Sequence, residues 1–343
     1  MNYRNFGNTG LFVSELCMGT MTFGGAGKAA FDAIGALDQA GADALVNKAI
    51  EGGINFFDTA DSYALHESEE MLGKALGNKR KDVIVATKAR FRISDNVNAV
   101  GLTRHHLINQ VETSLKALGT DYIDLYQIHA NDPYTPWEET LRALDDLVTQ
   151  GKIRYTGYCN LSAWEAMKAL AISRQHGWAE FKSAQCYYSI AGRELEREIV
   201  PMALDQNLAI MPWSPLAGGF LTGKFTREKE DAGSRRSNFD FPPINKEKAY
   251  DIVEAMQEIA HAHEATVARV ALAYLLHKPG VSSVIIGAKK MHQLEDNLKA
   301  VDLKFSEEEL NRLDEVSQLP MEYPHWFNAG PSDRLPGAKG WAQ

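Results

Sequence analysis

This sequence of 343 residues has few cysteines, no cysteines at the spacing of metal ligands, and no long apolar runs. The three cysteines, Cys17, Cys159 and Cys186, lie far apart, which is typical of reduced thiols in a cytosolic protein. No stretch approaches the roughly 18–20 apolar residues of a membrane span, and the first residues lack the apolar run of a signal peptide. We therefore expect a cytoplasmic protein with no metal site and no membrane span.

The chain also lacks a block of basic residues. Its net charge of −9 is spread along the sequence, which argues against nucleic acid or an anionic membrane surface as a partner. Its 45% hydrophobic content is ample for a large core. We expect one domain over residues 1–343, with an extended tail at 319–343 and a small molecule as the main partner. Neither a monomer nor a homo-oligomer is favoured.

Short apolar runs alternate with amphipathic stretches along most of the chain. A turn at residues 7–10 predicts a β-hairpin over residues 3–13. Eight evenly spaced strand–helix units favour a closed (β/α)8 TIM barrel of the α/β class over an open, doubly wound sheet. Strands are expected near residues 15–18, 54–57, 83–87, 123–128, 153–158, 182–186, 208–211 and 283–286. Helices are expected near residues 40–52, 66–77, 104–118, 137–149, 162–176, 193–205, 246–263, 266–277, 290–300 and 306–317.

Two long loops and a tail interrupt this pattern. Residues 19–39 follow the first barrel strand, and residues 214–245 follow the seventh. Loops of this length are usually lids or binding loops, and both would lie at the carboxyl ends of the strands, where barrel enzymes have their sites. The tail at 319–343 is rich in proline and aromatic residues. We interpret it as a strap packed on the barrel, in preference to a substrate or subunit contact.

Four ionisable side chains lie at or just after the carboxyl ends of consecutive strands. Asp58 follows the second barrel strand, and Tyr63 lies five residues further on. Lys88 follows the third strand and His129 the fourth. Each has an ordinary explanation when taken alone, such as a turn-forming carboxylate or a structural histidine. Because consecutive strand ends are neighbours in a barrel, we expect the four side chains to converge.

Such a cluster is suited to protonating an oxygen atom. The phenol of a tyrosine has an ordinary pKa of about 10, and a nearby ammonium would lower that pKa while a carboxylate holds the lysine in place. The tyrosine would then be the general acid in the reduction of a carbonyl, and the imidazole would orient or polarise the carbonyl oxygen. None of these residues supplies electrons, so a hydride cofactor is required.

Seven motifs resemble those of the aldo-keto reductase family and occur in the same order, and the resemblance covers nearly the whole chain. It implies a barrel enzyme that reversibly reduces an aldehyde or ketone to the alcohol with NADPH. The loop and carboxyl-terminal motifs are most similar to the branch containing bacterial general reductases and potassium-channel β subunits. The motifs are GNTGLFVSELCMGTMTFGG, GGINFFDTADSYALHESEEMLGKAL, VIVATK, LGTDYIDLYQIHAND, GKIRYTGYCN, MPWSPLAGGFLTGKF and IIGAKKMHQLEDN.

The resemblance also implies roles for particular residues. Tyr63 would be the proton donor, Lys88 would modulate its pKa, Asp58 would hold the lysine, and His129 would orient the carbonyl. The residues implied in NADPH binding are Gly19, Thr20, Asp58, Asn160, Gln185, Trp213, Ser214, Pro215, Leu216, Gly218, Lys224, Gly287, Lys289, Gln293, Asp296 and Asn297.

Different parts of this set would hold different parts of the cofactor. Asn160 and Gln185 would bind the nicotinamide amide, and Trp213 would stack on its ring. The segment 216–224 would meet the pyrophosphate, and residues from 287 onward would meet the adenosine end. Substrate contacts are expected from Phe23, Tyr63, His129, Trp213 and Trp326, whose aromatic character favours an apolar carbonyl compound.

The sequence departs from the family pattern in three places. Cys159 stands where many relatives have serine, and its thiol is a weaker hydrogen-bond donor to the nicotinamide than a hydroxyl. Asp296 stands where glutamate is common. Lys289 and Lys290 stand at the 2′-phosphate position, where relatives often carry arginine, and a lysine offers a point charge instead of a fork. We still expect NADPH to be preferred over NADH.

Three alternatives fit part of the sequence. A regulatory, nucleotide-sensing subunit would share the motifs but would not need the complete catalytic tetrad of Asp58, Tyr63, Lys88 and His129. A barrel isomerase or lyase without a nucleotide would leave the cofactor motifs unexplained. A Rossmann-type site is suggested by residues 25–30, which nearly match G-x-G-x-x-A. Those glycines lie well past the first strand, however, and Asp58 is too far along the chain to be the ribose carboxylate.

Overall fold

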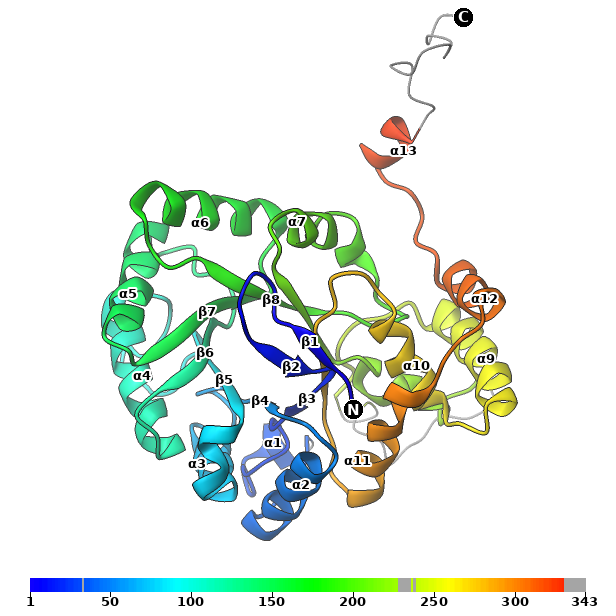
Figure 1. Cartoon of the computed structure of the whole chain (residues 1–343), viewed down its shortest axis with the longest axis horizontal. Helices are drawn as coiled ribbons and strands as arrows, with labels where there is room; N and C mark the ends of the chain where they lie inside the picture. Colours follow the sequence, from blue (N-terminus) through cyan, green and yellow to red (C-terminus); the bar gives the residue numbers. More distant parts are fainter. Residues whose placement is uncertain (33, 228–235, 237–238, 330–343) are drawn as a thin grey trace, which may run out of the picture.

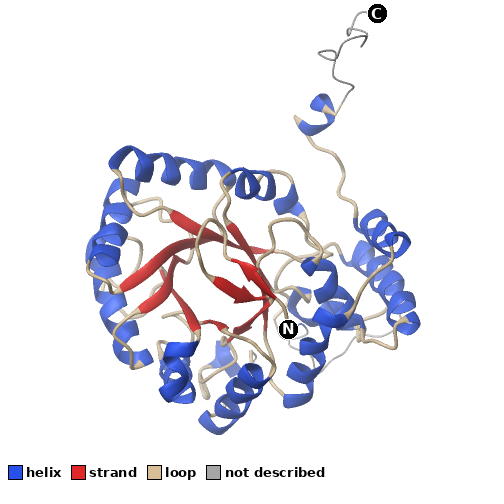
Figure 2. Cartoon of the chain, in the orientation of Figure 1, coloured by secondary structure: helices blue, strands red, loops and turns tan. Residues whose placement is uncertain are grey.

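The computed structural model describes residues 1–32, 34–227, 236 and 239–329. A hairpin of β1 (Tyr3–Asn5) and β2 (Phe12–Ser14) precedes an eight-stranded parallel sheet. Neighbouring strands of this sheet follow the order β10-β3-β4-β5-β6-β7-β8-β9, and Figure 2 shows them inside a ring of helices. The strands are β3 (Leu16–Gly19), β4 (Phe56–Asp58), β5 (Ile84–Ala89), β6 (Ile123–Ile128), β7 (Ile153–Cys159), β8 (Phe181–Tyr187), β9 (Ala209–Trp213) and β10 (Val284–Ile286).

Backbone hydrogen bonds between β9 and the segment before β10 close the sheet into a barrel. The Ile210 N–H donates to Gly280 O over 3.0 Å, and the Ser282 N–H donates to Ile210 O over 3.0 Å. All neighbouring strands are parallel, so their carboxyl ends share one rim, where Gly19 lies opposite Asp58. The expected (β/α)8 barrel with an amino-terminal hairpin is confirmed.

Helices surround the barrel, and local signals set where they begin and end. Thr103 Oγ1 accepts a hydrogen bond from the His106 N–H at the start of α4, and Gly119 ends this helix in the left-handed conformation at φ 62°. Within the described ranges, none of the helices has the length and apolar character needed to span a membrane. The helices are α1 (Ala29–Asp32), α2 (Gln39–Glu51), α3 (Glu67–Leu76), η1 (Gly77–Asp82), α4 (Arg104–Leu118), α5 (Trp137–Thr149), α6 (Ala163–His176), η2 (Glu194–Glu196), α7 (Ile199–Asp205), η3 (Ala217–Thr222), α9 (Lys246–Ala262), α10 (Val267–Leu276), α11 (Met291–Leu298), η4 (Lys299–Asp302), α12 (Glu307–Ser317) and α13 (His325–Asn328).

Apolar side chains fill the inside of the barrel at its amino-terminal end. Phe6 of the hairpin packs edge-on against Phe56 of β4, with ring centroids 5.5 Å apart, and both belong to a buried cluster with Leu125 and Met211. At Gly7 an added Cβ would lie 2.8 Å from backbone atoms that precede or begin β8 and β9, so only glycine fits there. The hairpin therefore closes this end and leaves the carboxyl-terminal rim for a site.

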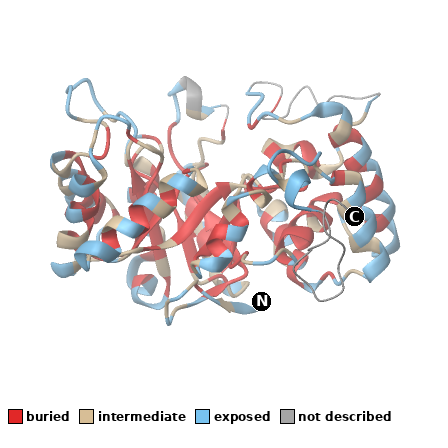
Figure 3. Cartoon of the chain, turned by 90° about the horizontal axis from the view of Figure 1, so that it is seen from above, coloured by how far each residue is buried: buried red, intermediate tan, exposed pale blue. Residues whose placement is uncertain are grey.

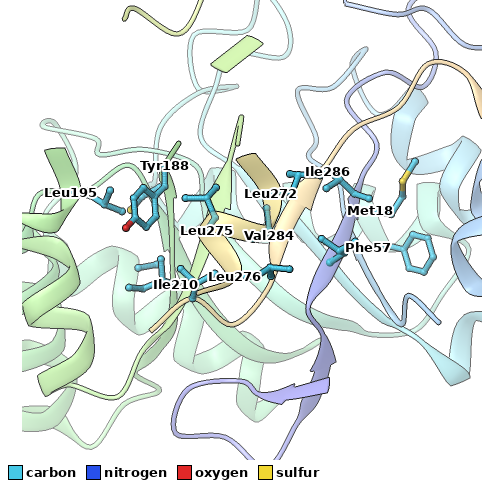
Figure 4. Close-up of a cluster of buried hydrophobic side chains, with 14 of the residues drawn as sticks. Met18, Phe57, Tyr188, Leu195, Ile210, Leu272, Leu275, Leu276, Val284 and Ile286 are labelled. Atoms are coloured by element: carbon cyan, nitrogen blue, oxygen red, sulfur yellow. The ribbon is translucent and has the colours of Figure 1, made fainter. Parts of the chain in front are cut away.

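A larger apolar core lies between the barrel and its helices. Figure 4 shows Leu272, Leu275 and Leu276 of α10 beside Val284 and Ile286 of β10, all of them buried. Figure 3 shows the same division across the molecule, with buried residues concentrated in the strands and the inner helix faces. This packing makes the strands a rigid frame for the side chains at the rim.

The helix expected at residues 193–205 is not continuous. The chain instead forms η2 and then α7, and the two are separated at Glu198, where φ is −129°. The proline ring of Pro201 would clash with the carbonyl of Arg197 in an unbroken helix, because proline excludes the residue four positions earlier. The apolar pattern alone does not reveal this break.

The described part of the tail contacts the barrel's outer segments through polar groups, such as His325 Nε2 with Arg197 O at 3.0 Å, but its aromatic side chains do not pack on the barrel as expected of a strap. Tyr323 and Trp326 are 72% and 55% exposed, and α13 lies outside the ring of helices (Figure 1). Trp326 packs instead against Tyr323, with ring centroids 5.9 Å apart. The Arg197 guanidinium anchors the start of the tail through an ion pair with Glu322 at 2.9 Å. Residues 330–343 of the tail lie outside the described residues.

Candidate active site

Lys88 is the central residue of the candidate site. It lies on β5, is fully buried, and donates hydrogen bonds from Nζ to Asp58 Oδ1 over 2.6 Å, Thr59 O over 2.7 Å and Tyr63 Oη over 3.2 Å. These contacts account for all the N–H donors of an ammonium group. The structure therefore brings together Asp58, Tyr63 and Lys88 at the carboxyl ends of β4 and β5.

Asp58 is held from several sides. Its Oδ1 accepts from Lys88, and its Oδ2 accepts from Gln185 Nε2 over 2.8 Å and from Gln127 Nε2 over 3.3 Å. A buried carboxylate needs such partners, because desolvation without them is costly. Gln185, predicted to bind the nicotinamide amide, thus gives part of its donor capacity to Asp58. Gln127, which is fully buried on β6, was not predicted as a site residue.

Burial and charge set the protonation states of this cluster. Burial alone would lower the pKa of Lys88, but Asp58 and Tyr63 raise it above its ordinary value, so the ammonium persists. Burial raises the pKa of Tyr63 above 10, although Lys88 opposes the rise. Lys88 thus lowers the phenol pKa as expected, but burial has the larger effect, so the pKa of Tyr63 lies above its ordinary value.

His129 follows β6 and lies beside the phenol. Its ring centroid is 5.8 Å from that of Tyr63 and 4.7 Å from that of Phe91, both edge-on. Burial lowers the pKa of His129 well below its ordinary value, and the charges of Lys88 and Arg90 add to this effect. In the described part of the chain, His129 Nδ1 has no hydrogen-bond partner. A neutral imidazole therefore lies edge-on to the ring of Tyr63, at the strand ends where we expected the four side chains to converge.

Asn160 and Trp213 are also brought together at this rim. Asn160 Nδ2 donates to His129 O over 3.0 Å, and Trp213 Nε1 donates to Asn160 Oδ1 over 2.9 Å. The Trp213 ring lies nearly parallel to that of Phe241, with centroids 5.7 Å apart, and tilted against Tyr187. The indole predicted to stack on the nicotinamide thus lies in an aromatic stack and is only partly buried.

The segment after β9 is folded by hydrogen bonds within itself. Ser214 Oγ accepts from the Gly218 N–H over 3.0 Å, which folds Pro215, Leu216 and Ala217 into a tight turn. Gly218 has φ 67°, and a Cβ there would lie 2.4 Å from Phe241 O. Predicted residue Lys224 lies further along this segment and is exposed.

The predicted adenosine-binding residues gather at the start of α11. Gln293 Oε1 accepts from the N–H groups of Lys289 and Lys290 over 2.9 and 3.1 Å. Asn297 is buried and its Nδ2 donates to Gly287 O over 3.5 Å. Asp296, also predicted to bind the adenosine end, lies on α11 between Gln293 and Asn297.

Asp296 is held by α10. Its Oδ2 accepts from Thr266 Oγ1 over 2.6 Å, and its Oδ1 pairs with Arg269 at 2.5 Å. Arg269 was not predicted as a site residue, because a lone arginine on an amphipathic helix gives no signal in the sequence. Its guanidinium pairs with Asp296 on α11.

Next to β10 on the rim, the first barrel strand ends at Gly19 and is followed by Thr20. The Thr20 N–H donates to Asp58 O over 2.9 Å, and a Cβ at Gly19 would lie 2.8 Å from Ile285 Cγ2. Phe23, predicted to contact the substrate, is 0% exposed and packs in the core. Its predicted role is therefore corrected: the side chain has no surface to offer. Trp326, on α13, is not brought to this site either.

Aromatic residues that sequence reasoning missed lie near the site. Phe91 is 39% exposed beside His129, and Phe241 is 40% exposed against Trp213. The buried Arg236 holds this part of the loop, because its guanidinium donates to Ala217 O over 2.6 Å and to Pro242 O over 2.8 Å. In the described ranges, no group of His, Cys, Asp and Glu could hold a metal ion.

Comparisons with known proteins agree over most of the chain. The sequence model described as "Aldo/keto reductase family" matches residues 15–318. The chain is 34% identical to the uncharacterized oxidoreductase YrpG of Bacillus subtilis, over 99% of this chain and 100% of the relative. It is 34% identical to versiconal hemiacetal acetate reductase of Aspergillus parasiticus, over 92% of this chain and 96% of that one. It is also 34% identical to a probable voltage-gated potassium channel subunit beta of Oryza sativa subsp. japonica, over 88% and 92%.

Proposed function

Because this chain belongs to the Aldo/keto reductase family, we propose that it reduces an aldehyde or ketone to the alcohol with NADPH. The observation that carries the proposal is the buried Lys88 ammonium, whose Nζ lies 2.6 Å from Asp58 and 3.2 Å from the Tyr63 hydroxyl. NADPH, when bound, supplies the hydride to the carbonyl carbon. The protein supplies the proton and holds the carbonyl oxygen.

Tyr63 would donate its hydroxyl proton to the carbonyl oxygen. Burial raises the pKa of this phenol, so it stays protonated around neutral pH and is available as a general acid. The negative charge left on the tyrosine oxygen would be stabilised by the Lys88 ammonium, 3.2 Å away. A proton from solvent would then restore the phenol for the next turnover.

His129 would orient the carbonyl oxygen beside Tyr63. Burial lowers the pKa of the imidazole, so the ring is neutral and presents an N–H donor without a competing charge. Phe91, edge-on to the ring at 4.7 Å, limits its rotation. This arrangement fits a small carbonyl group placed between the phenol and the imidazole.

The open rim offers groups suited to NADPH. Trp213 is partly buried and lies beside Asn160, as a stacking residue for a flat ring requires. At Gly219 and Gly287 an added Cβ would meet nothing within 4 Å, so a phosphate could come close to the backbone there. Lys289, Lys290 and the rest of the α11 start would hold the adenosine end.

Fluorescence titration with NADPH, run in parallel with NADH, tests the cofactor proposal. We expect saturable binding of NADPH and weaker binding of NADH, followed by carbonyl-dependent oxidation of NADPH in a panel of aldehydes and ketones. Absence of binding by both nucleotides would contradict the proposal, because the tetrad contains no source of electrons.

Lys289→Ala combined with Lys290→Ala should weaken NADPH binding by about tenfold or more and NADH binding by much less. The two lysines would contact only the 2′-phosphate, which NADH lacks. Dissociation constants from the same titration measure the effect. Lys299→Ala with Lys304→Ala is the matched control, since it removes two exposed lysines from the segment after α11. Equal losses for NADPH and NADH would move the phosphate site elsewhere.

A second candidate function is a nucleotide-binding regulatory subunit with slow turnover. The relative from rice, named as a probable potassium channel subunit beta, favours it. Single-turnover and steady-state rates separate the two. An enzyme would show a steady-state rate comparable to its single-turnover rate. A sensing subunit would oxidise one equivalent of NADPH and then turn over far more slowly.

A further inference from the structure

The turn that carries Tyr63 is strained. The three residues after it, Ala64, Leu65 and His66, have φ angles of 51°, 57° and 70°. The left-handed region is unfavourable for residues with a Cβ, and consecutive residues persist there only where their surroundings fix them. The position of the Tyr63 hydroxyl therefore depends on the groups that hold this turn.

His66 ends the turn and is held from two sides. Its Nδ1 lies 2.6 Å from Glu69 Oε2, and its Nε2 lies 3.1 Å from Gln110 Oε1. Glu69 is fully buried, and its other oxygen accepts from Thr87 Oγ1 over 2.5 Å. Thr87 directly precedes Lys88 on β5. The clamp thus ties the turn that carries the phenol to the strand that carries the ammonium.

Asp61 lies in the same interior, two residues before Tyr63. Its N–H donates to Lys88 O over 3.1 Å, and its carbonyl accepts from the His66 N–H over 2.8 Å. Its side chain is fully buried, yet among the residues that the structure describes neither carboxyl oxygen has a hydrogen-bond partner of ordinary geometry. A buried carboxylate without a partner is very costly, and such a group takes up a proton instead.

We propose that Asp61, His66 and Glu69 form a positioning cluster for Tyr63, in which Asp61 is a neutral carboxylic acid and the His66–Glu69 pair fastens the strained turn. These residues act through the backbone of the turn and not on the reacting atoms. The inference rests on the proposed function, because it takes Tyr63 as the proton donor. It adds a pH limit: ionised Asp61 would bring a second carboxylate next to Glu69 and loosen the turn.

Burial and the charges around Asp61 set the pH at which it ionises. Burial raises the pKa of Asp61 to about 8, and Glu69 adds to the rise, while His66, the Ser62 N–H and Lys88 oppose it. Burial alone would lower the pKa of His66, but the contact with Glu69 raises it overall. The folded chain therefore holds a proton on Asp61 that the unfolded chain loses near its ordinary pKa. This group's contribution to stability falls as pH rises toward about 8.

Two further titratable groups lie around the cluster from β6 and α4. Burial raises the pKa of Tyr126 well above 10, and Asp61 adds to that rise. Burial lowers the pKa of His106 to about 4. Neither group changes charge near pH 8, so a transition there belongs to Asp61 or to His66.

Asp61→Asn separates these two candidates, because the amide copies the neutral acid in shape and cannot ionise. We expect wild-type kcat to fall above pH about 8, and the variant to keep kcat within about threefold at pH 7 and to lose the alkaline fall. NADPH affinity should be unchanged in both. An alkaline fall that persists in the variant would assign the transition to His66 and overturn the role of Asp61.

Glu69→Gln tests the clamp. It should lower kcat by on the order of 10–100-fold without changing the dissociation constant of NADPH, because the hydroxyl of Tyr63 would be displaced while the cofactor site is untouched. Glu70→Gln is the matched control, since it removes the neighbouring, exposed carboxylate and should leave kcat unchanged. Wild-type kcat in Glu69→Gln would overturn the clamp. If this variant does not fold, the pH profile of Asp61→Asn decides.

Hydrogen exchange gives a readout that does not need turnover. Protection factors for the amides of residues 59–70 should drop between pH 7 and pH 9 in the wild type and stay constant in Asp61→Asn. If the wild type binds no NADPH but shows this difference, the proposed function fails, while the hold of the cluster on the turn is supported. If protection is the same in both proteins at every pH, the cluster proposal fails whatever the activity.

Discussion

Tyr63→Phe should lower kcat for carbonyl reduction by about 10²–10⁴-fold and leave the affinity for NADPH nearly unchanged. The substitution removes only the hydroxyl that lies 3.2 Å from Lys88 Nζ. The ring remains to pack edge-on against His129 at 5.8 Å, so the shape of the pocket is kept. The loss should therefore lie in the chemical step, because the proton donor is absent while the other groups stay in place.

Steady-state kinetics with a carbonyl substrate and fluorescence titration with NADPH measure the two quantities. Tyr158→Phe is the matched control, since it removes the hydroxyl of a different tyrosine, which lies on β7. In the described residues that buried hydroxyl has no hydrogen-bond partner. The control should keep wild-type kcat. A Tyr63→Phe protein with unchanged turnover would exclude Tyr63 as the acid.

Most of the barrel could be predicted from sequence because each element carries its own signals. The bounds expected for α4 and α5 agree with the structure, since Thr103 and Gly119 mark the ends of α4. The break at Glu198 and the exposed tail could not be predicted in the same way. Both depend on interactions beyond the local apolar pattern: a proline clash with the preceding turn, and aromatic residues that pack on one another instead of on the barrel.

The residues of the candidate site could be predicted where the order of the strands alone brings their side chains close together. Asp58, Lys88 and His129 end neighbouring parallel strands, so they meet whatever the loops do. Burial was not predictable in the same way. Phe23 follows a strand end like a pocket residue but is fully buried, and the phenol of Tyr63 is desolvated enough to reverse the expected direction of its pKa. Both outcomes depend on the three-dimensional surroundings, which single residues and their spacing do not specify.

Lys88→Met should abolish measurable turnover and also destabilise the fold by about 3–5 kcal/mol. It removes the partner of Asp58, whose side chain is 3% exposed and lies 2.6 Å from Nζ. The remaining carboxylate would keep its hydrogen bonds from Gln127 and Gln185 but lose its counter-charge. The pKa of Lys88 is raised in the folded state, so this stabilisation is fully present below the ordinary lysine pKa of about 10.4. The loss should therefore appear across neutral pH.

Denaturant unfolding at pH 7 measures the stability, and the double variant Lys88→Met with Asp58→Asn separates stability from catalysis. Replacing the unpaired carboxylate by a neutral amide should recover most of the lost free energy of unfolding, because the cost lies in the uncompensated charge. The double variant should still be inactive, since nothing stabilises the developing charge on Tyr63. A single variant as stable as the wild type would show that the ammonium is not the main partner of Asp58. A double variant that turns over would show that the tyrosine needs no cation.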